Sequence, residues 1–445
     1  MLRFGTDGVR GIANTELTPE YTLALGRAAA RVLGGERWLI GRDPRRSGSM
    51  LEAALVAGLT AEGVDVELLG VVPTPAVAYV AGLHREPGAV ISASHNPFGD
   101  NGIKLFASGG TKLDDGTQHR LEAVLDAIIA GVPPVAPTVG HGVGSTRFGG
   151  DDVASYLDHL VDALGSRRLD GLSVVLDCGH GAASGFAGDV FGRAGADVTV
   201  LHAEPDGVNI NDGVGSTDTS VLQAKVVDLG ADIGLAFDGD ADRVIAVDER
   251  GEVVDGDKVI ALCATDLKTR GELANDTVVV TVMSNLGFRL AMAEAGIEVV
   301  VTPVGDRYVL EEMAAGGHAL GGEQSGHVVF GRLASTGDGM LTGLLLAGLV
   351  HDSTEPLGVL ADRAMTRLPQ VLHNVRVAER DPEIVGALAE PIARIEQRLG
   401  RTGRVLVRPS GTEPLIRVMV EAADVAEAER AAAELVAAVE QHAAR

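Results

Sequence analysis

The stretch Ala194-Gly195-Ala196-Asp197-Val198-Thr199-Val200 joins the end of a helix to a β-strand, because a glycine that can close a helix precedes a run rich in β-branched residues. The same pattern recurs twice, and an apolar run followed by a helix-compatible segment lies upstream of every copy. The other copies are residues 62–68 and 295–301, and the upstream runs are residues 38–40, 174–176 and 278–280. Each copy predicts a strand–helix–strand unit with parallel strands and a right-handed crossover.

The spacing of the copies indicates how many domains the chain has. Their glycines, Gly63, Gly195 and Gly296, are 132 and 101 residues apart, which is several times the length of one such unit. Three related domains fit this spacing better than one large doubly wound sheet with chance similarity.

The C-terminal part of the chain has a different pattern. Residues 373–377, 404–407 and 415–420 look like strands, and Asp424 can cap the alanine-rich helix that follows. We therefore expect three repeated α/β domains with mixed, mainly parallel sheets and a C-terminal α+β domain. The expected boundaries are 1–148, 149–248, 249–364 and 365–445.

Composition excludes several classes of protein. The 445 residues include 37 Lys and Arg against 62 Asp and Glu, a net charge of −25, and only 3% aromatic residues. Nucleic acids and anionic membranes need clustered cations, so neither is an expected partner. Two cysteines form no disulfide framework, and the longest strongly apolar run, 340–350, is too short to cross a bilayer. With no signal-peptide pattern at the N-terminus, we expect a soluble cytoplasmic protein.

Asp238-Gly239-Asp240-Ala241-Asp242-Arg243 follows a buried-strand pattern, residues 231–237. Three alternating carboxylates repel one another unless a cation lies between them, and Mg²⁺ favours such oxygen ligands. An acidic surface turn is the alternative, but ligands of α/β proteins bind at strand ends, which favours a metal site. An EF-hand is rejected, because Arg243 stands where that loop needs glycine.

A second short strand, residues 88–91, leads into Ser92-Ala93-Ser94-His95-Asn96-Pro97. Asn-Pro favours a turn, so we expect Ser94 and His95 to be exposed at the strand end. Residues 100–102 should then turn the chain and return Lys104 to the same edge. These side chains suit a phosphoryl-accepting serine with charged neighbours, although a plain polar turn fits the pattern as well.

Two more polar loops are candidate binding sites. Arg408-Pro409-Ser410-Gly411-Thr412-Glu413 and the nearby Arg417 could bind a phosphate. In residues 321–327, Glu323 and Ser325 could bind sugar hydroxyls, and His327 could transfer a proton. By itself this second motif is more typical of a turn.

Together these motifs, and Phe4-Gly5-Thr6-Asp7-Gly8-Val9-Arg10-Gly11, resemble the α-phosphohexomutase superfamily over essentially the whole chain. Gln324 makes the chain most similar to the bacterial phosphoglucosamine mutase branch rather than to phosphomannomutases or phosphoglucomutases. The resemblance implies four domains around a central cleft, and it implies an isomerase that makes glucosamine 1-phosphate for UDP-N-acetylglucosamine, a cell-wall precursor.

The resemblance also implies a role for each motif. Ser94 would be the phosphoserine needed for activity, and it would hold one Mg²⁺ per subunit with three aspartates. Arg10, His95, Lys104, Arg243 and His327 would line the catalytic site. The metal ligands would be Asp238, Asp240 and Asp242; the sugar ligands Glu323 and Ser325; and the ligands of the non-reacting phosphate Arg408, Ser410, Gly411, Thr412 and Arg417.

The implied reaction passes the phosphoryl group of Ser94 to the sugar phosphate and back through glucosamine 1,6-bisphosphate, which needs positioning and cations. The protein would be a monomer or a homodimer. One rival is a haloacid-dehalogenase-type phosphatase, in which Asp238 would carry the phosphoryl group. The mid-chain position of the motif and Asp242 argue against it. A non-catalytic sugar-phosphate sensor is disfavoured because Ser94 and all three aspartates are present.

Overall fold

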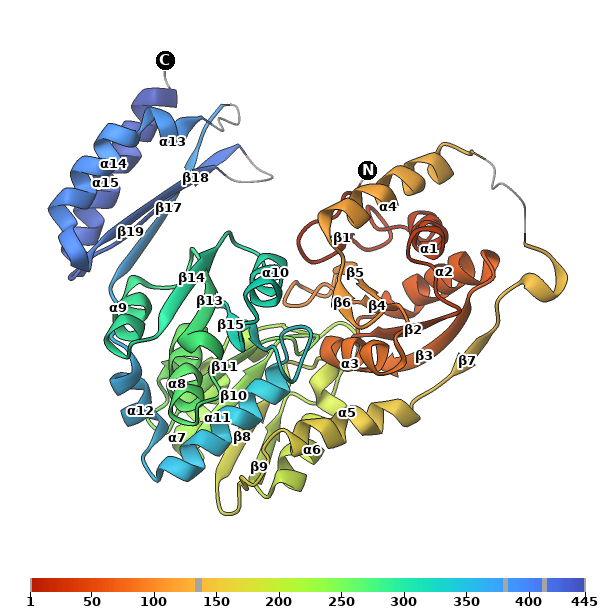
Figure 1. Cartoon of the computed structure of the whole chain (residues 1–445), viewed down its shortest axis with the longest axis horizontal. Helices are drawn as coiled ribbons and strands as arrows, with labels where there is room; N and C mark the ends of the chain where they lie inside the picture. The colour runs from red at the N-terminus through yellow and green to blue at the C-terminus, as the bar shows by residue number, and fades with distance from the viewer. Residues whose placement is uncertain (1, 133–137, 379–382, 410–413, 444–445) are drawn as a thin grey trace. The chain divides into compact units, whose positions relative to one another are not determined.

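The computed structural model describes residues 2–132, 138–378, 383–409 and 414–443. It divides into two compact units, which we call unit 1 and unit 2. Unit 1 comprises Met1–Val282 and Glu298–Ala361, and unit 2 comprises Met283–Ile297 and Asp362–Arg445. Unit 1 holds three mixed sheets with helices packed on them, and unit 2 holds one antiparallel sheet (Figure 1).

The three sheets of unit 1 share one four-strand topology. In each, the first two strands of the repeat pair in parallel, the third strand adds in parallel beside the first, and the fourth pairs antiparallel with the third. The first set is β2 (Arg37–Arg42), β3 (Asp65–Val71), β4 (Gly88–Ile91) and β5 (Asp100–Ala107); the second is β8 (Ser173–Asp177), β9 (Asp197–Leu201), β10 (Ile233–Phe237) and β11 (Val244–Asp248); the third is β13 (Thr277–Thr281), β14 (Glu298–Thr302), β15 (Leu320–Gly322) and β16 (Val328–Phe330). The predicted threefold repeat and the fold class are confirmed.

Four short strands extend these sheets. β1 (Val9–Ile12) and β6 (Thr111–Lys112) pair with β5, β7 (Thr146–Phe148) pairs with β3, and β12 (Val253–Val254) pairs with β11. The pairing of β1 corrects one expectation: Asp100–Gly102 are not a turn, because they are already paired with β1 as the start of β5. The chain turns earlier, over residues 94–99.

Helices cover the sheets of unit 1 and begin where the sequence offers caps. Thr18 Oγ1 accepts from the Tyr21 amide at the start of α1, and Asp114 Oδ1 accepts from Thr117 at the start of α4. Helices α1 and α2 pack so closely that a Cβ on Gly58 would lie 2.3 Å from the Leu23 carbonyl oxygen. The helices are α1 (Pro19–Leu33), α2 (Gly48–Ala61), α3 (Thr74–His84), α4 (Asp115–Ile129), α5 (Asp151–Asp162), α6 (Ala187–Ala194), α7 (Ser220–Leu229), α8 (Gly256–Thr269), α10 (Asp306–Gly316), α11 (Gly339–Ser353) and α12 (Leu357–Ala364), of which residues 362–364 are assigned to unit 2.

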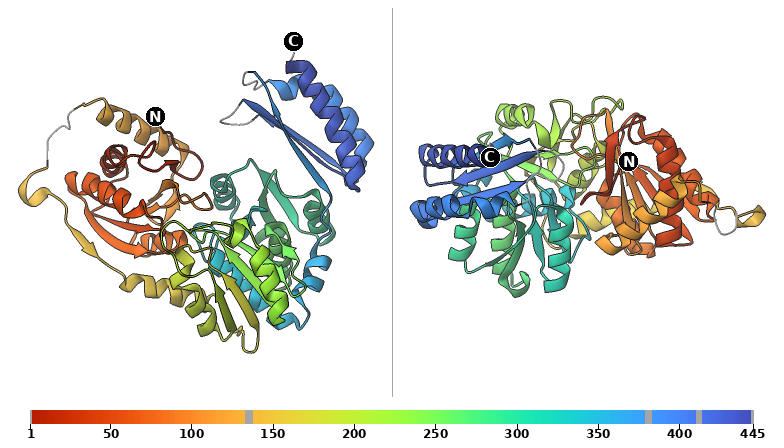
Figure 2. Two further views of the ribbon diagram at one scale, coloured as in Figure 1. Left: turned by 180° about the vertical axis from the view of Figure 1, so that it is seen from behind. Right: turned by 90° about the horizontal axis from the view of Figure 1, so that it is seen from above.

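Unit 2 is the predicted α+β domain with one added segment. Its strands run in the order β17 (Gln370–Arg376), β19 (Leu415–Glu421), β18 (Arg404–Pro409). Helices α14 (Ala389–Leu399) and α15 (Val425–Ala443) pack on this sheet, beside the short α13 (Ile384–Ala387) (Figure 2). Asp424 accepts from the Glu427 amide at 2.9 Å, as predicted for a cap. The added segment is α9 (Leu286–Glu294), held by Asn285, which hydrogen-bonds Glu421 and the Leu368 carbonyl.

Among the described residues, no helix combines the length and the apolar character that a membrane crossing requires.

Candidate active site

The loop after β10, residues 238–243, gathers three aspartates, as the sequence predicts. We call it the metal loop. The side chains of Asp238, Asp240 and Asp242 are buried, and one ligand atom from each lies within 4.8 Å of the others. Thr74, at the start of α3, donates its amide to the Asp240 carbonyl at 2.9 Å and its hydroxyl to Asp240 Oδ2 at 2.6 Å. The start of α3, which follows the first sheet's strand β3, therefore binds the loop that follows β10 of the second sheet.

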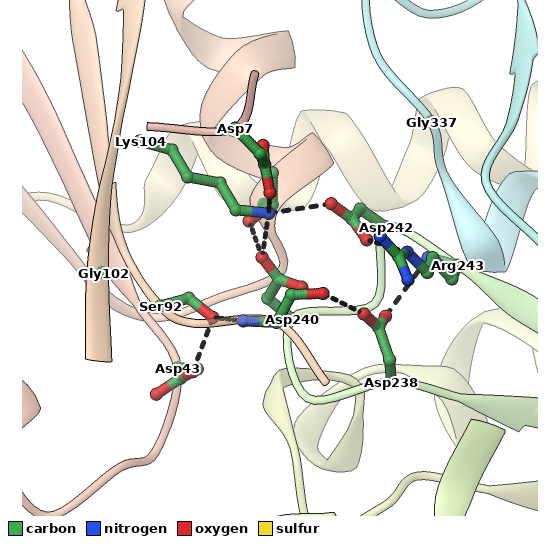
Figure 3. Close-up of polar contacts among 12 residues, drawn as sticks. Asp7, Asp43, Ser92, Gly102, Lys104, Asp238, Asp240, Asp242, Arg243 and Gly337 are labelled. Atoms are coloured by element: carbon green, nitrogen blue, oxygen red, sulfur yellow. Dashed lines mark hydrogen bonds and ion pairs between the residues drawn. The ribbon is translucent and has the colours of Figure 1, made fainter. Parts of the chain in front are cut away.

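Lys104, on β5, lies among carboxylates from both domains (Figure 3). Its Nζ is 2.7 Å from Asp240 Oδ2, 2.8 Å from Asp242 Oδ2 and 3.0 Å from Asp7 Oδ2. Burial opposes the charged amine, but these carboxylates outweigh it and raise the pKa of Lys104 well above its usual value. The chain itself therefore supplies one of the cations that the aspartates need.

The aspartates respond differently to this environment. Burial and the neighbouring carboxylates raise the pKa of Asp238 well above its usual value. For Asp242 burial acts in the same direction, but Lys104 and His327 reverse it and hold the pKa well below the usual value. The cations nearest to each carboxylate thus set the direction in which its pKa moves.

Ser94 contacts this loop directly. Its Oγ donates to Asp238 Oδ2 at 2.5 Å and lies 3.3 Å from His95 Nδ1. The expectation that Ser94 is exposed is wrong: the residue is fully buried, because the metal loop and the side chain of Arg45 cover the turn. His95 is partly buried.

Arg243, at the end of the metal loop, links this loop to the turn that carries Ser94 and His95. Its amide donates to Asp238 Oδ1 at 3.2 Å, and its Nη1 lies 3.2 Å from His95 Nδ1. Burial and the Arg243 charge lower the pKa of His95 to about 4, so this imidazole is neutral near pH 7. Arg10 makes a short contact with Asp7, the same aspartate that Lys104 contacts.

The loop between β15 and β16 lies against the strand that follows the metal loop. The Val244 amide donates to the Gly326 carbonyl at 3.1 Å, and a Cβ on Gly326 would lie 2.2 Å from the Val244 carbonyl oxygen. Ser325 is exposed, and the partly buried Glu323 accepts from the Gly305 amide at 3.3 Å. Gln324 donates to Asp255 at 3.2 Å.

His327 lies behind the metal loop and is only 1% exposed. Its Nε2 accepts from the Gly337 amide at 3.1 Å, so Nδ1 carries a proton and faces Asp242 Oδ1 at 3.9 Å. This position suits a residue that orients Asp242.

The predicted phosphate loop belongs to unit 2. Arg408 on β18 pairs with Arg417 on β19, so the two guanidinium groups are neighbours, and burial together with Arg417 lowers the pKa of Arg408. Ser410, Gly411 and Thr412 lie outside the described residues.

The buried aspartates fit a hard divalent cation. Asp240 Oδ1 and Asp242 Oδ1 are buried and have no hydrogen-bond partner within the described part of the chain. Unpartnered, acceptor-only oxygens are suitable ligands for Mg²⁺. Sequence reasoning missed three residues at this site: Asp7, Thr74 and Lys112, which contacts Asp7 and Asp306. Only Asp7 stands in a recognisable motif, residues 4–11.

Comparison with protein families gives a consistent result over nearly the whole chain. Models of phosphoglucomutase/phosphomannomutase match in order: α/β/α domain I at residues 1–130, domain II at 154–251, domain III at 255–368 and the C-terminal domain at 372–438.

Individual relatives agree with the family models. The phosphoglucosamine mutase of Rhodococcus jostii is 54% identical over 444 residues, 98% of each chain, and that of Frankia alni is 55% identical over 450 residues, 98% of this chain and 97% of the relative. A phosphoglucomutase/phosphomannomutase family protein of Burkholderia thailandensis superposes with a TM-score of 0.79 at 26% identity, covering 98% of this chain and 97% of that one. The N-acetylphosphoglucosamine mutase of Aspergillus fumigatus, solved with GlcNAc-6P and magnesium, has the same fold, with a TM-score of 0.71 at 18% identity over 100% and 96% of the chains.

Proposed function

Because the chain belongs to the α-D-phosphohexomutase superfamily and, within it, to the phosphoglucosamine mutases, we propose that it interconverts glucosamine 6-phosphate and glucosamine 1-phosphate. The observation that carries the proposal is the contact of Ser94 Oγ with Asp238, next to two further buried aspartates. A hydroxyl that will carry a phosphoryl group needs cations nearby, and Lys104 and Arg243 both lie at this loop.

In this proposal Ser94 is the phosphoryl carrier. The phosphoserine O–P bond breaks as a sugar hydroxyl oxygen forms a new P–O bond, the proton of that hydroxyl passes to Ser94 Oγ, and the product is glucosamine 1,6-bisphosphate. The bisphosphate then turns over, its other phosphate returns to Ser94 Oγ, and the proton that Ser94 Oγ gives up passes to the freed sugar oxygen. Atoms and charge therefore balance over the two half-reactions.

Asp238, Asp240 and Asp242 would hold Mg²⁺ together with a phosphoryl oxygen of Ser94. When bound, Mg²⁺ withdraws charge from the phosphoryl oxygens during transfer. Lys104 and Arg243 add fixed positive charge, Arg10 anchors Asp7 beside Lys104, and His327 Nδ1 faces Asp242 Oδ1 at 3.9 Å. His95 contributes a neutral acceptor 3.3 Å from Ser94 Oγ.

Substrate recognition is assigned to two separate loops. Glu323 and Ser325 would bind the sugar, and Gln324 would mark the preference for glucosamine. Arg408, Ser410, Gly411, Thr412 and Arg417 would bind the phosphate that does not react. The domain boundaries 1–148, 149–248, 249–364 and 365–445, a cytoplasmic location, and assembly as a monomer or homodimer stay predictions from the sequence.

A comparison of substrates tests the proposal. We expect the highest kcat/KM with glucosamine 6-phosphate, a lower value with glucose 6-phosphate and the lowest with mannose 6-phosphate. A higher kcat/KM for mannose 6-phosphate would assign the protein to another branch of the superfamily, and no turnover of any hexose phosphate would refute the mutase function.

A further inference from the structure

The backbone of Ser94 is in an unusual conformation for a serine. Its φ is 53°, in the left-handed region, where a side chain costs about 1–2 kcal/mol. Such a conformation persists only where surrounding contacts fix it. The peptide groups on both sides of the Ser94 side chain are held by buried polar groups.

On the amide side, the Ser94 N–H donates to Ser92 Oγ at 2.9 Å. Ser92 in turn donates its hydroxyl to Asp43 Oδ2 at 2.6 Å (Figure 3). Ser92 and Asp43 are both fully buried. Two consecutive hydrogen bonds, through Ser92, therefore link the amide of Ser94 to the buried carboxylate of Asp43.

On the carbonyl side, Arg45 binds the whole turn through its guanidinium. Nη2 donates to the Ser94 carbonyl at 2.9 Å and to the Asn96 carbonyl at 2.7 Å. Nη1 donates to the Asp100 carbonyl at 3.1 Å and makes a short contact with the Pro97 carbonyl, while Nε donates to Asp43 at 2.8 Å. Arg45 is 1% exposed and reaches no carboxylate of the metal loop, so its contacts concern the shape of the serine turn.

A second donor reaches the same two carbonyls from the loop that follows β9. Asn211 Nδ2 donates to the Ser94 carbonyl at 2.9 Å and to the Asn96 carbonyl at 3.2 Å. The Asn211 amide is itself bound to the Gly179 carbonyl at 3.0 Å. Gly239 of the metal loop packs on the same carbonyl, because a Cβ there would lie 2.6 Å from the Ser94 oxygen. The turn is thus fixed relative to the metal loop as well as within its own domain.

We propose that Arg45 and Asn211 are positioning residues for phosphoryl transfer: they bind the Ser94 and Asn96 carbonyls from two domains and hold Ser94 Oγ in line with the metal loop. This inference rests on the proposed function, because it needs Ser94 as the phosphoryl carrier. Neither residue touches the reacting atoms.

The hydrogen bonds from Arg45 and Asn211 to the Ser94 and Asn96 carbonyls should matter most when the phosphoryl group returns to the protein. The bisphosphate has to find Ser94 Oγ in one orientation, and a displacement of about 1 Å can cost about 10²-fold in rate. A loosened turn should slow this return, so that the bisphosphate escapes more often and dephosphorylated enzyme accumulates. The residues proposed to bind the sugar and the non-reacting phosphate are unchanged in these variants, so KM should change little.

The sharpest test compares Asn211→Asp with Asn209→Asp. Both changes are nearly isosteric and lie in one loop, but the Asn209 side chain donates to the Glu204 carbonyl and accepts from the Asp206 amide, both within its own loop. Asn211→Asp replaces the donor on two carbonyls with a carboxylate oxygen, which repels them. We expect kcat for glucosamine 6-phosphate to fall about 10- to 100-fold in Asn211→Asp with KM within about threefold, and Asn209→Asp to match the parent protein.

Arg45→Lys gives an independent test, with Arg167→Lys as its control. Arg167→Lys also removes a guanidinium group that contacts two partners, but these partners, Asp266 and Asp352, lie outside the site. Thermal unfolding of all four variants separates loss of fold from loss of rate. During turnover, intact mass should show less phosphate on Asn211→Asp and Arg45→Lys than on their controls, and added glucosamine 1,6-bisphosphate should restore part of their activity.

The outcomes separate this inference from the proposed function. If the parent protein turns over no hexose phosphate, the proposed function fails. If the parent is active but folded Asn211→Asp has the kcat and the phosphate content of Asn209→Asp, the positioning role is refuted. If Arg45→Lys does not fold, the Asn211 pair decides alone.

Discussion

The surroundings of Ser94 in unit 1 and the pair Arg408–Arg417 in unit 2 both gather cations, but only the first includes carboxylates that balance them. Lys104 lies within 3.0 Å of three aspartates, and Arg243 contacts the same loop. In the described part of unit 2, neither Arg408 nor Arg417 forms an ion pair, and burial together with the Arg417 charge lowers the pKa of Arg408.

The difference is consistent with two tasks. A nearly balanced, buried cluster can take up a small cation and leave it facing a phosphoryl group, and its geometry is fixed before the reaction starts. Two neighbouring arginines attract an anion and bind it through several donors. Removing a charged side chain of the Ser94 site in unit 1 should therefore lower kcat, and removing Arg408 or Arg417 in unit 2 should raise KM.

Among the charged residues of the two units, the largest effect is expected for Asp240→Asn in unit 1. The amide keeps the shape of the side chain but loses the charge that a divalent cation needs, so kcat should fall about 10³-fold while the fold persists. Asp266→Asn is the control, because its partners Arg167 and Arg270 lie outside the site. Turnover measured with Mg²⁺ and with excess chelator checks the prediction; full activity of the parent protein in chelator would contradict it.

Lys104→Met should affect activity and metal binding in opposite directions. Without the ammonium group kcat should fall about 10²-fold, but the aspartates lose a competing cation, so Mg²⁺ should stabilise the variant more than the parent protein. The rise in melting temperature between chelator and saturating Mg²⁺ measures this effect. Lys112→Met is the control, since Lys112 contacts Asp7 and Asp306 but no aspartate of the metal loop. Equal Mg²⁺ shifts in Lys104→Met and the parent would show that Lys104 does not compete with the metal.

A moderate effect is expected in unit 2. Arg417→Gln and Arg408→Gln should raise KM for glucosamine 6-phosphate about 10-fold with little change in kcat, because the interaction is present in the ground state and the transition state alike. Arg398→Gln, which breaks a surface pair with Glu434 in the same unit, serves as the control. A fall in kcat at unchanged KM would place these arginines in the chemistry and remove the contrast between the units.

The smallest effect concerns Asp338, a buried carboxylate that forms no ion pair with any described residue. Burial raises the pKa of Asp338 to about 6, although the residue caps α11 and accepts from Tyr156. Since the folded pKa lies above the unfolded one, Asp338 stabilises the fold at low pH, and this contribution is lost as pH rises through about 6. In asparagine Oδ1 still accepts from the Leu341 amide, and Nδ2 can donate to Tyr156 Oη in place of the bond that Tyr156 donates, so Asp338→Asn should gain about 1 kcal/mol relative to the parent between pH 5 and pH 8. Parallel pH profiles of the unfolding free energy would contradict it.

The sequence predicted those features that are encoded locally. A glycine before a β-branched run marks each repeat, and the alternating aspartates of residues 238–242 show a metal loop within six residues. The sheets and the acidic cluster could therefore be found without any knowledge of distant contacts.

Contacts between distant segments could not be predicted in this way. Lys104 and Asp240, or Arg45 and the Ser94 carbonyl, come together only when separate strands and loops have packed. The two wrong expectations have the same cause: Ser94 is buried by residues far away in the chain, and the strand containing Asp100 is extended by pairing with β1.

The most direct test of the whole account is to locate the phosphate on the isolated protein. Intact mass should show one added phosphate on part of the population, and peptide mapping should place it on Ser94. A phosphate ester there should survive hydroxylamine, and Ser94→Ala should lose both the added mass and turnover, by several orders of magnitude. Phosphate on Asp238, released by hydroxylamine as an acyl phosphate would be, or normal turnover by Ser94→Ala, would contradict the account.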